Sequence, residues 1–469
     1  MSEAQQLFDM LRQSAHPSVA DAIERLVREA PDRKLNRVNP LAFAASVNLD
    51  EEQVIAGFLH AGHIGLFDLS WNVLCPGCGG VLGANNSLKA VHGDAYTCTL
   101  CRGDYEPALD EVVDVTFTVN PRVRRIAAHD PDQLSPAEYF RQIYWGSGVD
   151  LPDEGYEDIV DDFIIEALEL PPGEKGVIAL QMPAEYVIVF EPVTHAVQFL
   201  DVRGEPTKER RTLPVVYERG YHNSEAMVYQ PGPMRIQVEN RTDIRLLPSV
   251  CLANDKMHAV LSKRRPFLTA QRILSNQTFR DIYRTETLGR EQRLKITSLT
   301  FLFTDLRGST ALYERVGDLA AFELVQAHFN ALNEIVCAEA GAVVKTIGDA
   351  VMATFPKPDR AVSAAMRMRE AMRQLNVERG GEDLLLKIGI HEGPCIAVNL
   401  NERQDYFGQT VNIASRVQNL ATSHEIFATG SVLGDPLTSN LIADRGLNPV
   451  SHSAALRGIS NEITVYSIP

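Results

Sequence analysis

LTFLFTDLRGST at residues 299–310 and GAVVKTIGDAVMATFP at residues 341–356 frame a long amphipathic segment with the spacing of a helix. Asp305 and Asp349 stand in these two stretches, and both are flanked by apolar residues of the kind that form strands. Adjacent strands that each deliver an aspartate can hold hard divalent cations, because such cations prefer carboxylate oxygens. Two cations held in this way bridge the phosphates of a nucleotide, so the stretch predicts a two-metal phosphate site.

The residues around this pair alternate between strand and helix patterns. A hairpin that turns near Gly348 is predicted over 342–355, so the sheet is expected to be mixed or antiparallel rather than a series of βαβ units. The remaining pattern consists of helices over 309–341, 359–376 and 408–421 and of strands over 299–305 and 384–393. Free backbone N–H groups at the helix start that follows Gly308 suit a phosphate group.

Three motifs follow one another in this region. FTDLRGST (303–310) contains the first aspartate, KTIGDAVMATF (345–355) contains the second, and DYFGQTVNIASR (405–416) comes next. In order and spacing they resemble the three motifs of the class III nucleotide cyclases, and the resemblance covers residues 296–469. It implies a ferredoxin-like catalytic domain with a mixed or antiparallel sheet, within a multidomain α+β protein.

The resemblance also implies the ligands of the metal ions and the phosphate contacts. Asp305 and Asp349 are expected to bind two Mg²⁺ or Mn²⁺ ions per active site, with the carbonyl of Leu306 as a further ligand. The turn that follows them is expected to contact the substrate through Gly308, Ser309 and Thr310.

Lys345 and Asp405 are expected, from the same resemblance, to read the base. Adenine presents an acceptor that an ammonium can donate to and an exocyclic amino group that a carboxylate can accept from. Guanine presents the reverse pattern, so this pair favours ATP over GTP. A solvated position on the hairpin is the alternative for Lys345, and specificity for GTP or a pyrimidine nucleotide stays open.

Asn412 and Arg416 are four residues apart, so they project from one face of a predicted helix. In the family that this sequence resembles, the asparagine positions the ribose and the arginine stabilises charge that builds up on the α-phosphate. Arg457 falls where the family usually has a phosphate-binding lysine, which keeps the charge but changes the side chain. His391 is interpreted as a packing residue, because cyclases of this type need no histidine.

The reaction implied is attack of the ribose 3′-hydroxyl on the α-phosphate of ATP, which gives cyclic AMP and pyrophosphate. In the family, one chain supplies the metal and base-reading groups and its partner supplies the asparagine and arginine. Because this chain carries the whole set, we expect a homodimer with two equivalent sites at its interface. The alternative is a regulatory protein that binds nucleotide without turning it over.

Four of the seven cysteines form two close pairs. CPGC places Cys75 and Cys78 on one turn, and CTLC places Cys98 and Cys101 on another, with 19 residues between the two motifs. This is the spacing of a zinc ribbon. Four thiolates close a tetrahedral shell and leave no position for substrate, so one Zn²⁺ is expected in a structural role.

Size and charge limit the remaining possibilities. The chain has 469 residues, which predicts about three domains, and a formal net charge of −16. This charge repels phosphate backbones, so the composition does not favour DNA binding. Neither a secretory signal nor an apolar run long enough to span a membrane is visible, and the cysteine usage suits a reducing compartment. We therefore expect a cytoplasmic protein that takes part in intracellular signalling.

Three further regions are expected in front of the cyclase-like domain. The first is helical and resembles a winged helix, with Asp50 as the cap of one helix and Gly62 near its end. After the cysteines come short β-prone runs at intervals typical of an antiparallel sandwich, followed by one linker helix. A role in regulating the cyclase is the hypothesis. The expected boundaries are 1–70, 71–110 for the ribbon, 111–265 for the sandwich, 266–295 for the linker and 296–469.

Overall fold

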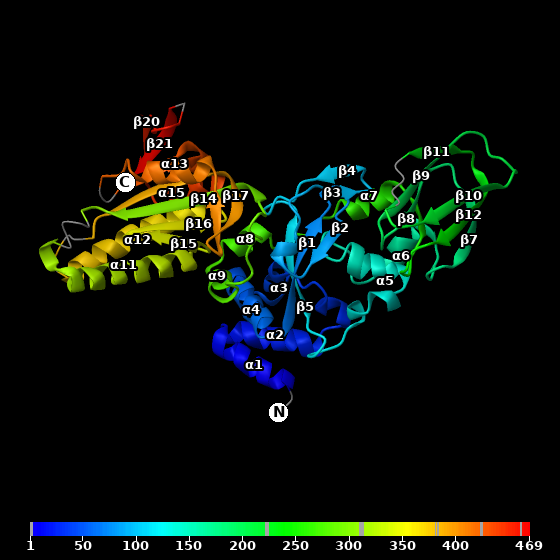
Figure 1. The fold of residues 1–469 in the computed structure, drawn as a ribbon, viewed down its shortest axis with the longest axis horizontal. Helices are drawn as coiled ribbons and strands as arrows, with labels where there is room; N and C mark the ends of the chain where they lie inside the picture. Colours follow the sequence, from blue (N-terminus) through cyan, green and yellow to red (C-terminus); the bar gives the residue numbers. More distant parts are fainter. Residues whose placement is uncertain are drawn as a thin grey trace. The chain divides into compact units, whose positions relative to one another are not determined.

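The computed structural model describes residues 3–220, 225–308, 314–379, 381, 384–422, 425–459 and 462–469. It divides into two compact units, each with its own core, which are drawn in Figure 1. The first unit comprises residues 1–107 and 114–268. The second comprises residues 269–469 together with the short segment 108–113, which is inserted between two parts of the first. Among the described helices, none has both the length and the apolar character needed to cross a membrane.

Helices open the first unit, as the sequence predicted. Asp50 caps the fourth helix by accepting a hydrogen bond from the N–H of Gln53 at 3.0 Å, and Asn39 caps the third by accepting from two N–H groups. Both caps satisfy donors that a helix start leaves unpaired. The helices are α1 (Glu3–Ser14), α2 (Pro17–Glu29), α3 (Pro40–Val47) and α4 (Glu51–His63).

A three-stranded sheet of order β2-β1-β5 completes this helical region. Its strands are β1 (Phe67–Leu74), β2 (Val81–Asn85) and β5 (Val113–Val119). The boundaries expected for the ribbon and the sandwich are therefore wrong here, because β1 and β5 pair although the sequence analysis assigned them to different regions. The last four residues of β1 and six of the seven residues of β5 are buried, so neither strand shows the regular alternation that marks a strand with one solvent-exposed face.

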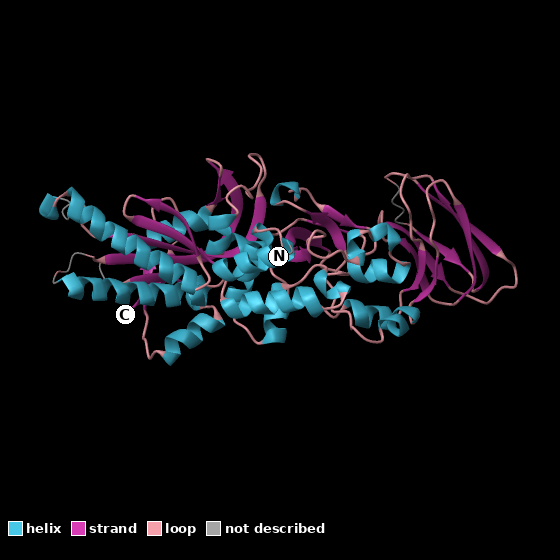
Figure 2. Cartoon of the chain, turned by 90° about the horizontal axis from the view of Figure 1, so that it is seen from below, coloured by secondary structure: helices cyan, strands magenta, loops and turns pink. Residues whose placement is uncertain are grey.

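The strand-rich part of the first unit contains two sheets, of order β10-β12-β7 and β11-β9-β8-β13-β6, which share one apolar core. Figure 2 shows this region as strands joined by loops. The strands are β6 (Ile164–Ala167), β7 (Lys175–Met182), β8 (Tyr186–Glu191), β9 (Ala196–Val202), β10 (Arg211–Tyr217), β11 (Ala226–Tyr229), β12 (Gly232–Asn240) and β13 (Ser249–Leu252).

The expectation of a wholly antiparallel arrangement is wrong for two strand pairs. Strand β10 pairs with β12 in parallel, and β11 pairs with β9 in parallel. The cause is that the chain alternates between the two sheets from β9 to β12, so each strand meets its partner after a crossover rather than a hairpin. The described helices of this part are short, namely α5 (Pro136–Tyr139), a π-turn over Phe140–Tyr144, α6 (Tyr156–Asp161) and α7 (Asp255–Leu261).

The second unit is built on an eight-stranded sheet of order β15-β16-β14-β17-β19-β21-β20, with β18 paired to β17. The neighbours are antiparallel except for β17 and β19, so the sheet is mixed, as the hairpin predicted. Its strands are β14 (Leu294–Leu306), β15 (Ala342–Ile347), β16 (Ala350–Phe355), β17 (Leu386–Leu400), β18 (Arg403–Phe407), β19 (Ile426–Thr429), β20 (Val450–Ala454) and β21 (Ile463–Ile468).

Two long helices pack side by side against this sheet (Figure 1). Leu332 and Val336 of the first and Met368 of the second are fully buried in one core with Phe355 of the sheet. The sequence predicted one helix over 309–341. Residues 314–316 are helical, but the helix is interrupted at Gly317, whose φ of 79° favours glycine, and α11 begins after it. The helices are α11 (Asp318–Ala338), α12 (Pro358–Arg379), α13 (Gln409–Gln418), α14 (Gly430–Leu433) and α15 (Pro436–Asp444).

The linker expected over 266–295 is not one helix. Two short helices, α8 (Ala270–Leu274) and α9 (Gln277–Ile282), take its place, and β14 already begins at Leu294. Thr269 and Asn276 each accept a hydrogen bond from the N–H three residues further on, so each starts a separate helix. These residues belong to the second unit and not to a spacer in front of it.

The segment 108–113 is fastened to the same unit through one carboxylate. Asp110 accepts hydrogen bonds from Thr297 N and Oγ1, at 3.0 and 2.6 Å, and from Ser298 N at 2.9 Å. The N–H of Leu109 donates to the carbonyl of Lys295 at 2.9 Å. All these partners lie on β14, the strand that ends at Asp305, so residues from the N-terminal half hold the central strand of the second unit.

Candidate active site

Asp305 lies at the end of β14, the central strand of the second unit. Its backbone stands opposite Lys387 of β17, and its carboxylate lies 3.9 Å from the ammonium of that lysine. Partial burial raises the pKa of Asp305, the charge of Asp349 raises it further, and Lys387 opposes both effects. Asp305 and Asp349 are therefore close enough to repel each other when both are ionised.

Asp349 occupies the two-residue turn between β15 and β16, together with Gly348 at φ 65°. Thr304 of β14 accepts a hydrogen bond from the N–H of Val351 at 3.2 Å, which ties this turn to the strand that carries Asp305. The Oδ2 atom of Asp349 is buried and has no hydrogen-bond partner among the described residues. A buried carboxylate oxygen without a partner is costly unless a ligand satisfies it.

These two carboxylates fit divalent cations. They come from adjacent antiparallel strands, they repel each other, and one oxygen is left without a donor. Hard oxygen donors in this arrangement are what Mg²⁺ and Mn²⁺ bind, and two protein carboxylates leave positions open for phosphate oxygens. Leu306, whose carbonyl the sequence analysis proposed as a further ligand, directly follows Asp305 and has a buried side chain.

The phosphate turn is described only in part. Gly308 adopts a φ of 75° with open space where a side chain would stand, so the chain turns there without obstruction. Ser309 and Thr310 lie outside the described residues, so their predicted contacts with substrate stay predictions.

The two residues expected to read the base meet each other although they are far apart in sequence. The ammonium of Lys345 on β15 lies 2.5 Å from the carboxylate of Asp405 on β18. Asp405 is almost buried, with 11% of its side chain exposed, whereas 41% of the Lys345 side chain is exposed. The second oxygen of Asp405 accepts a hydrogen bond from the N–H of Tyr406 at 2.8 Å. A donor and an acceptor thus stand side by side, and their role in reading a base stays a prediction.

Asn412 and Arg416 lie on α13, as the helical spacing predicted. Asn412 is exposed, and Arg416 is half-buried. A side chain at Gly458 would lie 3.4 Å from a guanidinium nitrogen of Arg416, so this arginine rests against the turn that also carries Arg457. Arg457 itself is exposed. Two cations are thereby brought to one region, which suits a phosphate, although their catalytic roles are untested.

Helix α13 lies in close contact with the strand that faces Asp305. A side chain at Gly389 of β17 would stand 2.1 Å from the backbone nitrogen of Gln418, so only glycine permits this approach. Gln418 also lies beside Asp305, whose pKa it lowers. Gln418 was not among the predicted site residues. Its position two residues after the third motif was the signal that the sequence offered.

Two histidines of the second unit, His328 and His391, have side-chain contacts of their own. His328 of α11 is fully buried with its Nδ1 atom 3.3 Å from the sulfur of Met372, and burial lowers its pKa to about 4. His391 of β17 pairs with the hydroxyl of Thr429 at 2.8 Å, and burial lowers its pKa to about 4 as well. Both rings are therefore neutral at physiological pH and have structural partners, as expected for His391.

The four paired cysteines converge in the first unit, with Cys98 on β3 (Tyr96–Cys98) and Cys101 just before β4 (Gly103–Tyr105). Their sulfur atoms all lie within 4.8 Å of one another. The sulfurs of Cys75 and Cys101 are 3.7 Å apart, as are those of Cys78 and Cys98. A zinc ion bound at ~2.3 Å to each sulfur would set these edges at about 3.8 Å, so the donor set fits a tetrahedral metal.

Comparison with known proteins finds a family match for each of two regions of the chain. Residues 1–281 match a family of unknown function, DUF5939, and residues 292–443 match the adenylate and guanylate cyclase catalytic domain. Adenylate cyclase 2 of Rhizobium meliloti (strain 1021) is 31% identical over 213 residues, which cover 43% of this chain and 56% of that protein. An adenylate cyclase of Anabaena cylindrica is 27% identical over 185 residues, which cover 36% of each chain.

The chain thus spans 56% and 36% of the length of these two relatives. Among solved structures, the adenylyl cyclase CyaB from P. aeruginosa is 26% identical, with 38% of this chain and 96% of that chain covered and a TM-score of 0.34. The chain belongs to the DUF5939 family, and residues 292–443 form an adenylate and guanylate cyclase catalytic domain.

Proposed function

We propose that this protein is an adenylate cyclase that converts ATP to 3′,5′-cyclic AMP and pyrophosphate. The observation that carries the proposal is the pair Asp305 and Asp349, which lie at the end of β14 and in the turn before the adjacent strand β16. One buried carboxylate oxygen of Asp349 has no hydrogen-bond partner among the described residues. Divalent ions bound there would lower the pKa of the ribose 3′-hydroxyl and neutralise the charge of the leaving phosphates. Cyclases of this family use Mg²⁺ or Mn²⁺ for this purpose.

The arginine and asparagine of α13 complete the chemistry. The guanidinium of Arg416 stays charged at any physiological pH and presents a planar fork of donors to phosphate oxygens. It would stabilise the negative charge that builds up on the α-phosphate, while Asn412 would orient the ribose for attack. Arg457, next to the glycine on which Arg416 rests, would bind the phosphates that leave.

ATP is the substrate that the base-reading pair supports best. Lys345 can donate to the ring acceptor of adenine, and Asp405 can accept from its amino group. The 2.5 Å ion pair shows that both groups reach the same place. The family includes guanylate cyclases, so GTP is the second candidate.

We propose a homodimer, because in this family two chains contribute different residues to each active site. The surface of the second unit supports this proposal. Three large apolar side chains are exposed on the β17–β18 hairpin, namely Ile396 at 36%, Leu400 at 48% and Phe407 at 67%. Ile396 and Leu400 share one face of β17, and Phe407 pairs with Ile396 across the hairpin. An exposed apolar patch of this kind is typical of a protein interface.

In the first unit we propose one structural zinc at Cys75, Cys78, Cys98 and Cys101. It would join the turn that follows β1 to the short hairpin β3–β4. A side chain at Gly77 would stand 2.8 Å from the sulfur of Cys101, so the turn accepts only glycine there. The metal would have a structural role, because four thiolates fill its tetrahedral shell and leave no position for a substrate.

We propose that the first unit regulates the second, with segment 108–113 as the connection. Asp110 accepts hydrogen bonds from Thr297 and Ser298 near the start of β14, and Asp305 lies at the other end of this strand. A change in the first unit that pulls on this segment would act on the strand that holds the metal site. The proposed location is the cytoplasm, and the winged-helix-like and sandwich-like parts are proposed as sensor modules rather than DNA readers.

Turnover of ATP, GTP, CTP and UTP by the purified full-length protein with Mg²⁺ or Mn²⁺ tests the proposal. Cyclic AMP as the main product, resolved by chromatography, is the expected result. A different cyclic nucleotide would overturn the ATP assignment alone. Nucleotide binding without any cyclic product, even with Mn²⁺, would favour a regulatory nucleotide-binding protein. The test uses the full-length protein. A variant that lacks all residues before 269 would lose segment 108–113, which belongs to the second unit.

A further inference from the structure

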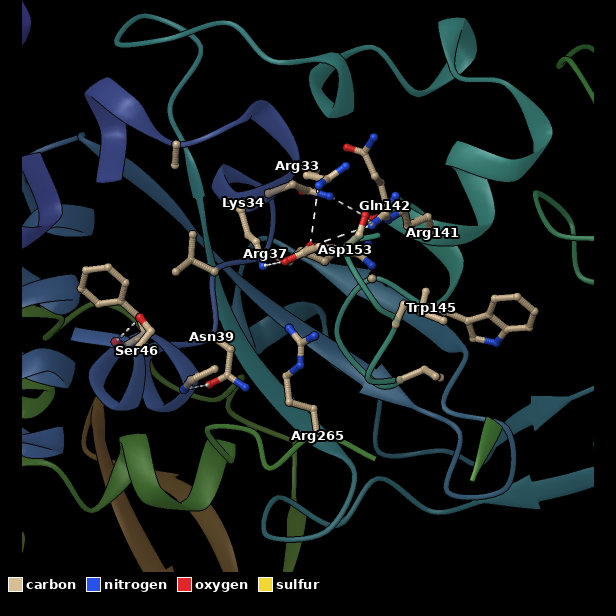
Figure 3. A pocket seen from close by; sticks show the side chains of 18 of the residues that line it. Arg33, Lys34, Arg37, Asn39, Ser46, Arg141, Gln142, Trp145, Asp153 and Arg265 are labelled. Carbon is tan, nitrogen blue, oxygen red and sulfur yellow. Dashed lines mark hydrogen bonds and ion pairs between the residues drawn. The ribbon is translucent and has the colours of Figure 1, made fainter. Parts of the chain in front are cut away.

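A cavity of about 320 Å³ lies in the first unit and is drawn in Figure 3. It is bounded by α2, α3, the turn between them and residues 141–153. The lining contains one acidic side chain, Asp153, and five basic side chains. The basic residues are Arg33, Lys34, Arg37, Arg141 and Arg265.

The cations surround a carboxylate in this pocket. The ammonium of Lys34 lies 2.5 Å from Asp153, and guanidinium nitrogens of Arg33 and Arg141 lie 3.7 and 3.9 Å from it. Hydrogen bonding to Lys34 is the main reason why the pKa of Asp153 is lowered. Figure 3 shows these three basic side chains around Asp153, with Arg37 beside them. The geometry therefore already accommodates one anionic group. Arg141 also pairs with Glu138 at 3.8 Å and Arg265 pairs with Asp150 at 2.7 Å, so among the described residues Arg33 and Lys34 are the two lining cations whose ion pairs are with Asp153 alone.

Arg37 is held in a costly conformation. Its φ is 47°, in the left-handed region that residues other than glycine rarely adopt. Its guanidinium donates to the carbonyl of Ile143 at 2.5 Å, and burial lowers its pKa, which the charge of Asp114 only partly offsets. A strained backbone conformation such as this one is found more often at functional sites than in the rest of a protein.

The rest of the lining suits an organic molecule. The Oε1 atom of Gln142 is buried and has no hydrogen-bond partner within the described part of the chain. Apolar side chains form much of the wall, among them Leu26, Ala42, Phe43, Val149 and Leu151. Pockets of this volume, with an apolar wall and a few convergent polar groups, are typical of small-molecule sites.

We propose that this pocket of the DUF5939 region binds a small organic anion, a carboxylate or a phosphate ester with an apolar body. Arg33, Lys34 and Arg141 would bind the anionic group, and the apolar wall would contact the body of the molecule. Nucleic acid does not fit, because the basic groups line a cavity rather than a surface and the chain carries a net charge of −16. Solvated surface charges alone do not explain the cluster, since only 11% of the Arg141 side chain is exposed.

Phenyl phosphate and benzoate are matched probes, because they share one apolar body and differ in the anion. Phenol tests the body alone, and inorganic phosphate tests the anion alone. Binding to the full chain is measured by calorimetry without added divalent metal. The double variant Arg33→Gln/Lys34→Gln removes two exposed cations of the pocket, and Lys208→Gln/Arg210→Gln removes two exposed cations elsewhere in the same unit.

We expect phenyl phosphate or benzoate to bind, and the pocket double variant to weaken this binding by about tenfold or more, since two charge-assisted contacts are lost. The control double variant should leave the dissociation constant unchanged. Asp153→Asn should tighten binding, because it removes the anion that competes for the same cations. Which probe binds better identifies the anion.

Failure of both organic probes to bind at concentrations up to about 10 mM would overturn the proposal, because weaker binding has no specificity to report. Binding that the pocket double variant leaves unchanged would overturn it as well, since the anion would then lie elsewhere. If the double variant unfolds, Asp153→Asn alone decides, because the proposal requires tighter binding and a purely structural cluster does not.

Discussion

The chain presents two sets of metal-type ligands that differ in almost every physical respect. Four sulfurs lie within 4.8 Å of one another on two short turns of the first unit. Two carboxylates, Asp305 and Asp349, lie at the ends of adjacent strands in the second unit, and one oxygen has no partner in the part of the chain that the structure describes. The first set is complete without any outside molecule, whereas the second leaves positions open for a substrate. Loss of the first should therefore change stability, and loss of the second should change activity.

The largest effect is expected for Asp349→Ala. Cyclase activity should fall by about a thousandfold or more, because a metal ligand contributes several kcal/mol to the transition state. Thermal unfolding should change little or shift upward, since the variant removes a buried carboxylate oxygen that has no partner. Product formation and melting temperature are measured on the same sample.

The matched control is Asp444→Ala, an exposed aspartate at the end of α15 in the same unit. It should keep full activity. An Asp349→Ala protein that stays folded and active would show that this carboxylate does not hold a catalytic cation.

Arg416→Ala should lower kcat by about 10² to 10³, the range for removing one preorganised donor from a developing charge. Arg416→Lys should recover only part of the loss, because a lysine keeps the charge without the planar fork. Kinetics with ATP at saturating metal separate kcat from KM. Equal loss in kcat for an exposed arginine such as Arg445 would instead indicate a general effect of charge.

Cys98→Ser should lower the free energy of unfolding by about 3 kcal/mol or more, because it opens a site whose metal binding is coupled to folding. It should also reduce bound zinc, measured by elemental analysis, to well below one ion per chain. The control is Cys337→Ser, an exposed cysteine of α11 that should change neither quantity. Full zinc content with unchanged stability in Cys98→Ser would contradict a closed four-cysteine site.

The smallest effect is expected at the base-reading pair. Lys345→Gln together with Asp405→Asn should change the ratio of ATP to GTP turnover by roughly tenfold, since each replaces a charged hydrogen-bonding group with a neutral amide. The measurement is the ratio of kcat/KM values for the two nucleotides. An unchanged ratio would assign the Lys345–Asp405 ion pair to structure and leave specificity to other residues.

Local patterns predicted much of both ligand sets. The C-x2-C pairs and the hairpin around Gly348 each depend on a few consecutive residues, so their form can be read from spacing. The contact of Gly389 with Gln418 could not be predicted, because it depends on how α13 packs on β17. The pairing of β1 with β5 and the parallel pairs of the sandwich-like part depend on crossovers for the same reason.

The anion pocket shows the same limit most clearly. Arg37, Arg141 and Arg265 are each more than a hundred residues apart in sequence, and nothing near any one of them signals the others. The prediction of one helix over 266–295 was wrong for a local reason. Thr269 and Asn276 act as caps that divide an otherwise helical pattern.

Complementation between two inactive variants tests the account of the catalytic unit most directly. Asp349→Ala lacks a proposed metal ligand and Arg416→Ala lacks the proposed phosphate donor, and each is expected to be inactive alone. If every active site combines the metal carboxylates of one chain with the arginine of its partner, mixed dimers contain one intact site. Random mixing of equal amounts should then restore about a quarter of wild-type activity. Half of the dimers are mixed, and one of the two sites in each mixed dimer is intact. No recovery in a mixture whose chains are shown to co-purify would contradict sites shared between two chains.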